Sequence, residues 1–176
     1  MHLTTKCSIS GRDMSPSDDV IIFPYFYSQP GEPEFAYCEN VALRSEFEVW
    51  HLRDKITKKV RDFWIQEYHQ ATSFSILAEN ENYLIARSLI ENRVLLFFLN
   101  HVFSIEFTRD IWKRFKDLIL TSKEENINTI VEHTLSWSVD HTKSRVSVQT
   151  KTIRRDSIIL SIAEWLSLQE VLSTSG

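Results

Sequence analysis

The second half of the chain repeats a strand followed by a capped helix at a spacing of 53 residues. Ser104-Ile105-Glu106-Phe107-Thr108 aligns with Ser157-Ile158-Ile159-Leu160-Ser161, and Trp112 aligns with Trp165. In both copies a hydroxyl residue ends the strand, as expected of a helix N-cap, and a tryptophan follows at helical spacing. Duplication of one strand–helix unit and convergence on a common strand–helix pattern both explain this repeat.

The residues around the repeat alternate with a period of two, which is typical of antiparallel strands. Four strand-like segments precede the first helix, and only three clear ones precede the second. Residues 93–99 are apolar on both faces, which predicts a covered central strand. Thr108 and the Ser161–Glu164 capping box predict helices at about 109–121 and 162–172. The predicted class is α+β, an antiparallel sheet with two ββ(β)βα-like units packed by helices.

A region of a different kind, residues 1–70, precedes these units, which occupy residues 71–176. Strand-like runs at residues 20–23 and 35–38 flank a Pro-Gly turn and predict a hairpin. Ser45 and Glu48 have capping-box spacing, and the apolar residues after them recur at helical spacing. We therefore expect one long helix over residues 46–69, with both regions packed as one compact unit.

The stretch Cys7-Ser8-Ile9-Ser10-Gly11 has the form of a zinc knuckle in which serine replaces the second cysteine. Followed by the predicted hairpin and helix, it resembles a degenerate, metal-free treble-clef zinc finger over residues 7–50. This resemblance implies that Ser45 and Glu46 stand where the helix of that family supplies its ligands. We predict a metal-free knuckle closed instead by aromatic packing of Phe23, Tyr25, Phe35, Tyr37, Phe47 and Trp50.

A structural zinc ion needs four ligands, normally thiolates and imidazoles. If the knuckle did bind a metal, the ligands would be Cys7, Cys38 and His51, with His2 as an alternative imidazole and Glu46 as a poor fourth ligand. A Cys7–Cys38 disulfide is a further alternative. We predict none of these and expect no cofactor.

Composition restricts the classes of function. The chain has 176 residues, 43 % of them hydrophobic, which is enough for a folded core. Its three glycines form no phosphate-binding loop motif. The net charge of −4 argues against nonspecific coating of duplex nucleic acid. The longest apolar run is too short to cross a membrane, and the chain start lacks a signal-peptide core, so we expect a soluble cytoplasmic protein with no membrane partner.

No pattern of nucleophile and base identifies a catalytic site. His133 lies among apolar residues of a predicted strand, and His141 lies in a predicted hairpin turn, where structural roles explain both. We therefore predict no catalytic residues and favour a non-enzymatic protein.

Two surfaces carry polar and basic side chains. On the predicted long helix, Lys55, Lys58, Lys59 and Arg61 form a basic cluster that we interpret as a solvated face. The last predicted hairpin has a polar face that is either solvated or a binding surface for a nucleic-acid backbone or an acidic protein. This candidate binding surface comprises Arg145, Ser147, Gln149, Lys151, Arg154 and Arg155.

Three functions fit these observations. The first is a protein–protein interaction or regulatory module, such as an inhibitor, with another protein as its partner. The second is a single-stranded nucleic-acid-binding protein, because the topology of residues 73–172 loosely resembles the PC4 and whirly type of ββββα repeat. The third is an enzyme whose site is assembled from scattered residues. An apolar sheet face carrying His133 and Trp137 is to be covered either by residues 1–70 or by a second chain, and the second alternative is a homodimer.

Overall fold

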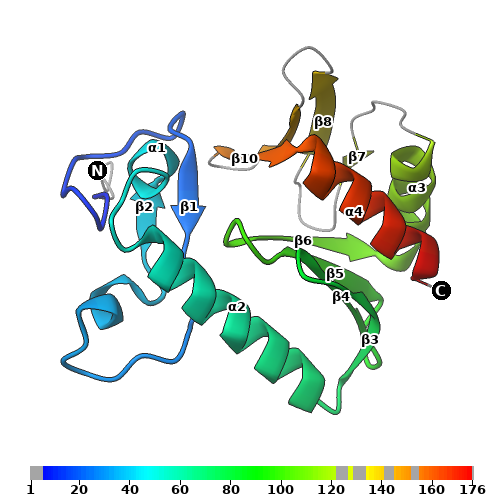
Figure 1. Ribbon diagram of the computed structural model, residues 1–176, viewed down its shortest axis with the longest axis horizontal. Helices are drawn as coiled ribbons and strands as arrows, with labels where there is room; N and C mark the ends of the chain where they lie inside the picture. Colours follow the sequence, from blue (N-terminus) through cyan, green and yellow to red (C-terminus); the bar gives the residue numbers. More distant parts are fainter. Residues whose placement is uncertain (1–5, 122–126, 129–133, 141–144, 152–154, 176) are drawn as a thin grey trace.

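The computed structural model describes residues 6–121, 127–128, 134–140, 145–151 and 155–175 (Figure 1). Helices pack on antiparallel sheets, so the predicted α+β class is confirmed. The first unit has the predicted ββββα order, and its strands form a sheet in the order β3-β4-β5-β6. Its elements are β3 (Phe74–Glu79), β4 (Tyr83–Ser88), β5 (Arg93–Phe98), β6 (Phe103–Thr108) and α3 (Arg109–Leu120).

The second unit contains four strands, whereas the sequence predicted three clear ones. The additional strand, β7 (Ile127–Asn128), is too short to show alternation in the sequence. Val131 and His133, which we assigned to the next strand, lie outside the described residues. The sheet order is β10-β9-β8-β7. The other elements are β8 (Thr134–Asp140), β9 (Arg145–Lys151), β10 (Arg155–Ser161) and α4 (Ile162–Thr174).

Both units use the same strand register, which supports duplication over convergence. Strands β8 and β9 align with β4 and β5 at a shift of 52 residues, whereas β10 and α4 align with β6 and α3 at a shift of 53. The second unit therefore has one more residue between its last two strands. Tyr83↔Phe98 in the first unit corresponds to Leu135↔Thr150 in the second. Likewise, Leu96↔Ile105 corresponds to Val148↔Ile158, and Val94↔Phe107 corresponds to Val146↔Leu160.

The two units pack through their helices. Helix α3 contacts β5 and β6 of its own unit and β7 of the other, and α4 reciprocally contacts β9, β10 and β3. Trp112 and Trp165 are both buried in the core between the sheets. Our expectation of one sheet was wrong, since there is a sheet on each side of the helices. Trp137 is also buried here, against Phe115 of α3, so the apolar face that suggested a homodimer is covered within the chain.

The N-terminal region differs from the predicted hairpin. Strand β1 (Val20–Ile22) pairs with β2 (Val41–Leu43), and residues 35–38, which we predicted as the returning strand, instead belong largely to the 3-10 helix η1 (Pro33–Tyr37). Pro33 explains this difference, because proline cannot donate to a strand ladder and suits the first turn of a helix.

The predicted long helix is broken into α1 (Arg44–Phe47) and α2 (Arg53–Gln70). Ser45 does not cap a helix, because α1 already begins one residue earlier. Val49 is 85 % exposed although its spacing predicted a core position. Trp50 accounts for the break, since its ring packs on Tyr37 and Phe47 instead of continuing the helical face.

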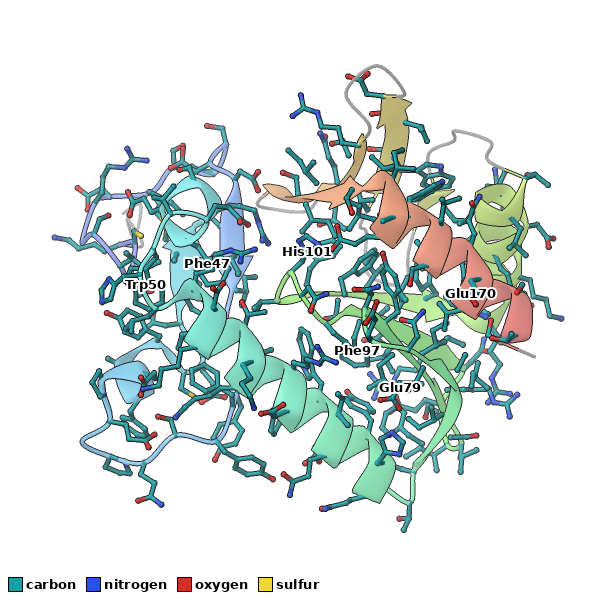
Figure 2. The ribbon with its side chains drawn as sticks, in the orientation of Figure 1. Phe47, Trp50, Glu79, Phe97, His101 and Glu170 are labelled. Carbon is teal, nitrogen blue, oxygen red and sulfur yellow. The ribbon has the colours of Figure 1, made fainter. Side chains whose placement is uncertain are left out.

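Helix α2 covers the outer face of the first sheet. Its buried residues Ile56, Val60 and Trp64 belong to the same core cluster as Phe97 of β5, and the Trp64 and Phe97 rings are 4.9 Å apart. Figure 2 shows Phe97 between α2 and the strands of the first sheet. Leu96 packs on the opposite face of β5, against the core that contains α3 and α4. The prediction that residues 93–99 form a central strand covered on both faces is confirmed.

Candidate functional site

A groove lies where the N-terminal region meets the two units. It consists of two hollows of about 440 Å³ and 470 Å³ that share Arg53 and His101. Figure 2 shows His101 between the N-terminal region and α4. We call this surface the junction groove. It is lined by Arg12, Asp18, Asp19, Leu43, Arg44, Ser45, Glu48, Arg53, Asp54, Thr57, Lys58, Arg61, Asn100, His101, Ser157, Ile159 and Glu164.

The β5–β6 turn places His101 against the start of α4. The His101 Nε2 atom donates to Glu164 Oε1 at 2.8 Å. The second carboxylate oxygen of Glu164 accepts from the backbone N–H and hydroxyl of Ser161, both at 2.8 Å, which completes the predicted capping box. The hydrogen bond from His101 is the main reason that the pKa of Glu164 is lowered to about 2, against the opposing effect of burial.

The His101–Glu164 pair lacks the arrangement needed for nucleophilic catalysis. That chemistry requires a hydroxyl or thiol within hydrogen-bond reach of the base. The Ser161 hydroxyl bonds to Glu164 and caps α4 through the Glu164 amide, at 3.2 Å. In the described part of the chain, no Ser, Thr or Cys side chain hydrogen-bonds to the imidazole. The pair therefore joins the first unit to the second, and its geometry does not identify a catalytic site.

The opposite wall of the junction groove is also held by polar contacts. Asp19, just before β1, accepts from the Ser157 amide at 3.0 Å and from the Ser157 hydroxyl. The buried Arg44 donates through Nη1 to the His101 carbonyl oxygen at 3.3 Å. The same Nη1 lies 3.7 Å from Glu48 Oε1. These contacts tie β1 and α1 to the two units and fix the shape of the groove.

The charges that line the junction groove are balanced. Arg53 contacts Glu48 at 3.1 Å and Asp54 at 2.9 Å, and Lys58 pairs with Asp62 just outside the groove. A surface that binds a polyanion presents an excess of cations, which this groove lacks. The five cationic residues are Arg12, Arg44, Arg53, Lys58 and Arg61, and the five acidic ones are Asp18, Asp19, Glu48, Asp54 and Glu164.

The structure separates the three residues that we named as metal-ligand candidates. Cys7 Sγ donates to Glu46 Oε2 at 3.1 Å, whereas Cys38 Sγ lies 3.7 Å from the Phe26 carbonyl oxygen. The His51 ring lies against Trp50. Both thiols are free. No group of three potential ligand side chains occurs within the described ranges, which leave out His2.

The knuckle turn itself is formed. Gly11 has a φ of 74°, which glycine adopts readily, and its amide donates to the Cys7 carbonyl oxygen at 2.8 Å. The Leu43 amide donates to Cys7 Sγ at 3.3 Å. Hydrogen bonds from Ser10 and then Cys7 lower the pKa of Glu46. The ligand positions implied by the treble-clef resemblance are thus occupied by a hydrogen-bonded cluster of Cys7, Ser10 and Glu46.

Aromatic packing closes the small N-terminal unit, mainly as predicted. Phe23 packs edge-on against Phe47 at 5.5 Å and against Tyr37 at 6.5 Å. Trp50 packs on Tyr37 and Phe47, whereas two predicted members differ, because Phe35 and Tyr25 are about half exposed. Tyr25 packs on Phe63 of α2 instead.

The predicted binding surface lies partly on the outer face of β9. Arg145 is exposed there, and Ser147 and Gln149 are half-buried, with Gln149 Nε2 donating to Ser147 Oγ at 3.3 Å. Lys151 and Arg155 belong to β9 and β10, but their side chains lie outside the described residues, as does all of Arg154.

This outer face differs systematically from its counterpart on the first sheet. The equivalent positions on the first sheet are apolar and lie toward α2, whereas those on the second sheet are hydroxyl or amide residues. A polar face suits contact with water or a polar partner. The equivalent pairs are Leu84 and Ser136, Ala86 and Ser138, Leu95 and Ser147, and Phe97 and Gln149.

Sequence reasoning missed the residues that form the junction groove. Glu164 was identified only as a capping residue, and Arg61 only as part of a basic cluster. His101 and Glu164 are 63 residues apart, so no local pattern connects them. The nearest signal was Ser161–Glu164, which correctly placed the start of α4 beside the groove.

Comparisons with protein-family models, curated proteins and solved structures found no match to this chain. The treble-clef and whirly-type resemblances therefore remain predictions. None of the described helices has the length and apolar character needed to span a membrane.

Proposed function

We propose that this protein is a non-enzymatic interaction module that binds a polar segment of another protein in the junction groove. The observation that carries this proposal is the groove's balanced set of charges beside Ile159, an apolar side chain that is 56 % exposed. Protein interfaces commonly surround apolar contacts with a polar rim of donors and acceptors. A segment with side chains of both signs matches such a lining.

The arrangement of His101 supports a binding role over an enzymatic one. Its imidazole is committed to Glu164, and the hydroxyl nearest to that carboxylate caps α4. Two common catalytic arrangements place a nucleophile against the imidazole or use two carboxyl groups with separated roles. The observed contacts instead hold the groove walls in place.

The second candidate, a single-stranded nucleic-acid-binding protein, is favoured by the presence of two ββββα units. Base stacking on the β9 face would require exposed aromatic rings. Trp137, on the neighbouring strand, is only 4 % exposed and points into the core. The balanced groove and the net charge of −4 also argue for a protein partner.

A matched pair of variants tests the proposal. Ile159→Arg places a charge in the junction groove, whereas Leu166→Arg changes a side chain on α4 that is 58 % exposed and does not line the groove. Wild type and both variants are immobilised and incubated with nuclease-treated extract of the source cells, and retained proteins are quantified by mass spectrometry. We expect proteins that wild type and Leu166→Arg retain but Ile159→Arg loses by about tenfold or more. Equal retention by Ile159→Arg would contradict the proposal.

Fluorescence anisotropy with labelled single-stranded DNA tests the second candidate. At about 20 mM salt, a protein that binds nucleic acid through phosphate contacts shows its highest affinity. Our proposal expects no binding under these conditions. Binding that weakens steeply as salt is added would favour the nucleic-acid candidate instead.

A further inference from the structure

Arg61 differs from the other cations on its side of the junction groove. Arg53 contacts Glu48 and Asp54, and Lys58 contacts Asp62. Arg61 is half-buried and lines the hollow of about 440 Å³, yet within the described ranges it has no hydrogen bond or ion pair. Its nitrogens are not among the fully buried atoms, so an anion that enters the hollow can reach the guanidinium.

Thr57 provides a second donor on the same side of α2. It stands four residues before Arg61, so the two side chains are neighbours on one helix face. Its hydroxyl is buried and has no hydrogen-bond partner among the described residues. A buried hydroxyl without a partner is unfavourable. An acceptor group bound between Thr57 and Arg61 would give both side chains a hydrogen-bond partner.

The acidic groups facing Arg61 are already committed. Glu164 accepts from His101 and Ser161, and Asp54 is 93 % exposed and contacts Arg53. One uncompensated positive charge matches one monoanion, and a guanidinium binds a planar carboxylate through paired N–H donors. A phosphate dianion would need further cations.

We infer that Arg61 and Thr57 form a carboxylate site, which receives a single Asp or Glu side chain or the C-terminal carboxylate of the bound segment. This inference rests on the proposed function, because it names the chemical group that anchors the partner in the junction groove.

Carboxylate binding is measured by NMR on the arginine Nε–Hε signals of the ¹⁵N-labelled full chain. The probe is acetate, titrated against chloride at constant ionic strength. We expect the Arg61 signal, identified by its absence in Arg61→Gln, to shift with a Kd on the order of 1–10 mM. The signal of Arg114, an exposed arginine on α3, should not move. Thr57→Val should weaken acetate binding about threefold or more.

Two further carboxylate probes and one neutral control distinguish the sources of the carboxylate. N-acetylglycine represents a chain terminus, and N-acetylglutamate amide represents an acidic side chain. N-acetylglutamine amide is the neutral control for the acidic side chain. Tighter binding of one carboxylate probe assigns the source. An Arg61 signal that does not shift with acetate would overturn the inference. A Kd for inorganic phosphate at least about tenfold lower than the Kd for acetate would overturn it as well.

The inference can fail separately from the proposed function. If Arg61→Gln retains the proteins that Ile159→Arg loses, the junction groove binds its partner without this site. Arg114→Gln serves as the matched arginine control in that assay. If the acetate shift occurs but Ile159→Arg retains all proteins, the carboxylate site stands and the proposed function falls.

Discussion

At the scale of single residues, the contact between His101 and Glu164 joins the first unit to the second beside the junction groove. The imidazole comes from the β5–β6 turn and the carboxylate from the first turn of α4. In that turn Val102 adopts a φ of 49°, a left-handed conformation that is rare for a β-branched residue. Such a conformation persists only when the surrounding contacts impose it. We conclude that packing of this turn holds His101 in the junction groove.

Glu164→Gln should remove the charge while keeping the helix cap, because glutamine also serves in a capping box. The pKa of Glu164 is lowered to about 2, so its contribution to stability is present above pH 4.5 and is lost as the pH falls toward 2. We expect the variant to lose about 2 kcal/mol of unfolding free energy at pH 7, allowing for partial exposure of the carboxylate. The loss should shrink between pH 4.5 and 2.

Urea unfolding across this pH range measures the effect. Glu170→Gln, an exposed change on the same helix, is the control and should have little effect. A difference between wild type and Glu164→Gln that stays constant from pH 7 to pH 2 would show that the charge does not stabilise the fold.

The knuckle at Cys7 should be stable without metal. Cys7 already donates to Glu46 and accepts from Leu43, so hydrogen bonds occupy the thiol. We expect the purified protein to carry no stoichiometric zinc, and excess EDTA to leave its thermal midpoint unchanged. One zinc ion per chain, lost together with stability on Cys7→Ser, would contradict this expectation.

At the scale of elements, the two units differ most in how their outer faces are covered. Phe97 lies beneath α2, whereas its equivalent, Gln149, lies on the polar outer face of β9. Phe97→Ala should lower the free energy of unfolding by about 3–5 kcal/mol, because it leaves a cavity. Gln149→Ala should change it by less than about 0.5 kcal/mol. Comparable losses for both variants in urea unfolding would show that the second face is also packed.

The elements predicted correctly are those defined by local signals. Thr108 accepts from the Ile111 amide and Ser161 caps α4, because a hydroxyl followed by an apolar helix needs no distant partner. The break before α2 could not be predicted in this way. It depends on Trp50 packing against Tyr37 of η1. The sequence predicted a strand at residues 35–38 and an unbroken helix through Trp50, so it did not indicate this contact.

At the scale of the whole molecule, the N-terminal region is attached to both units. Helix α2 covers the first sheet, and Asp19 bonds to Ser157 at the edge of the second sheet. The junction groove exists only because these attachments place α1 and α2 beside β10 and α4. Its residues are therefore spread from Arg12 to Glu164, which explains why sequence patterns located the helix caps but not the site.

Asp19→Ala should loosen this assembly. The carboxylate accepts two hydrogen bonds from Ser157, so its loss should lower the free energy of unfolding by about 1–3 kcal/mol. Amide hydrogen exchange should accelerate at Ser157 while remaining unchanged at Leu96 in the central strand. Unaltered protection of Ser157 would indicate that β10 does not depend on this attachment.

The central claim is that a partner protein occupies the junction groove, and site-specific photocrosslinking in living cells tests it most directly. A benzophenone amino acid is introduced at Ile159 in the groove or at Leu166 outside it, two positions of similar exposure. We predict a discrete crosslinked protein from position 159 that is absent from position 166 and resists nuclease treatment. Identical crosslinks from both positions, or none from position 159, would contradict the claim.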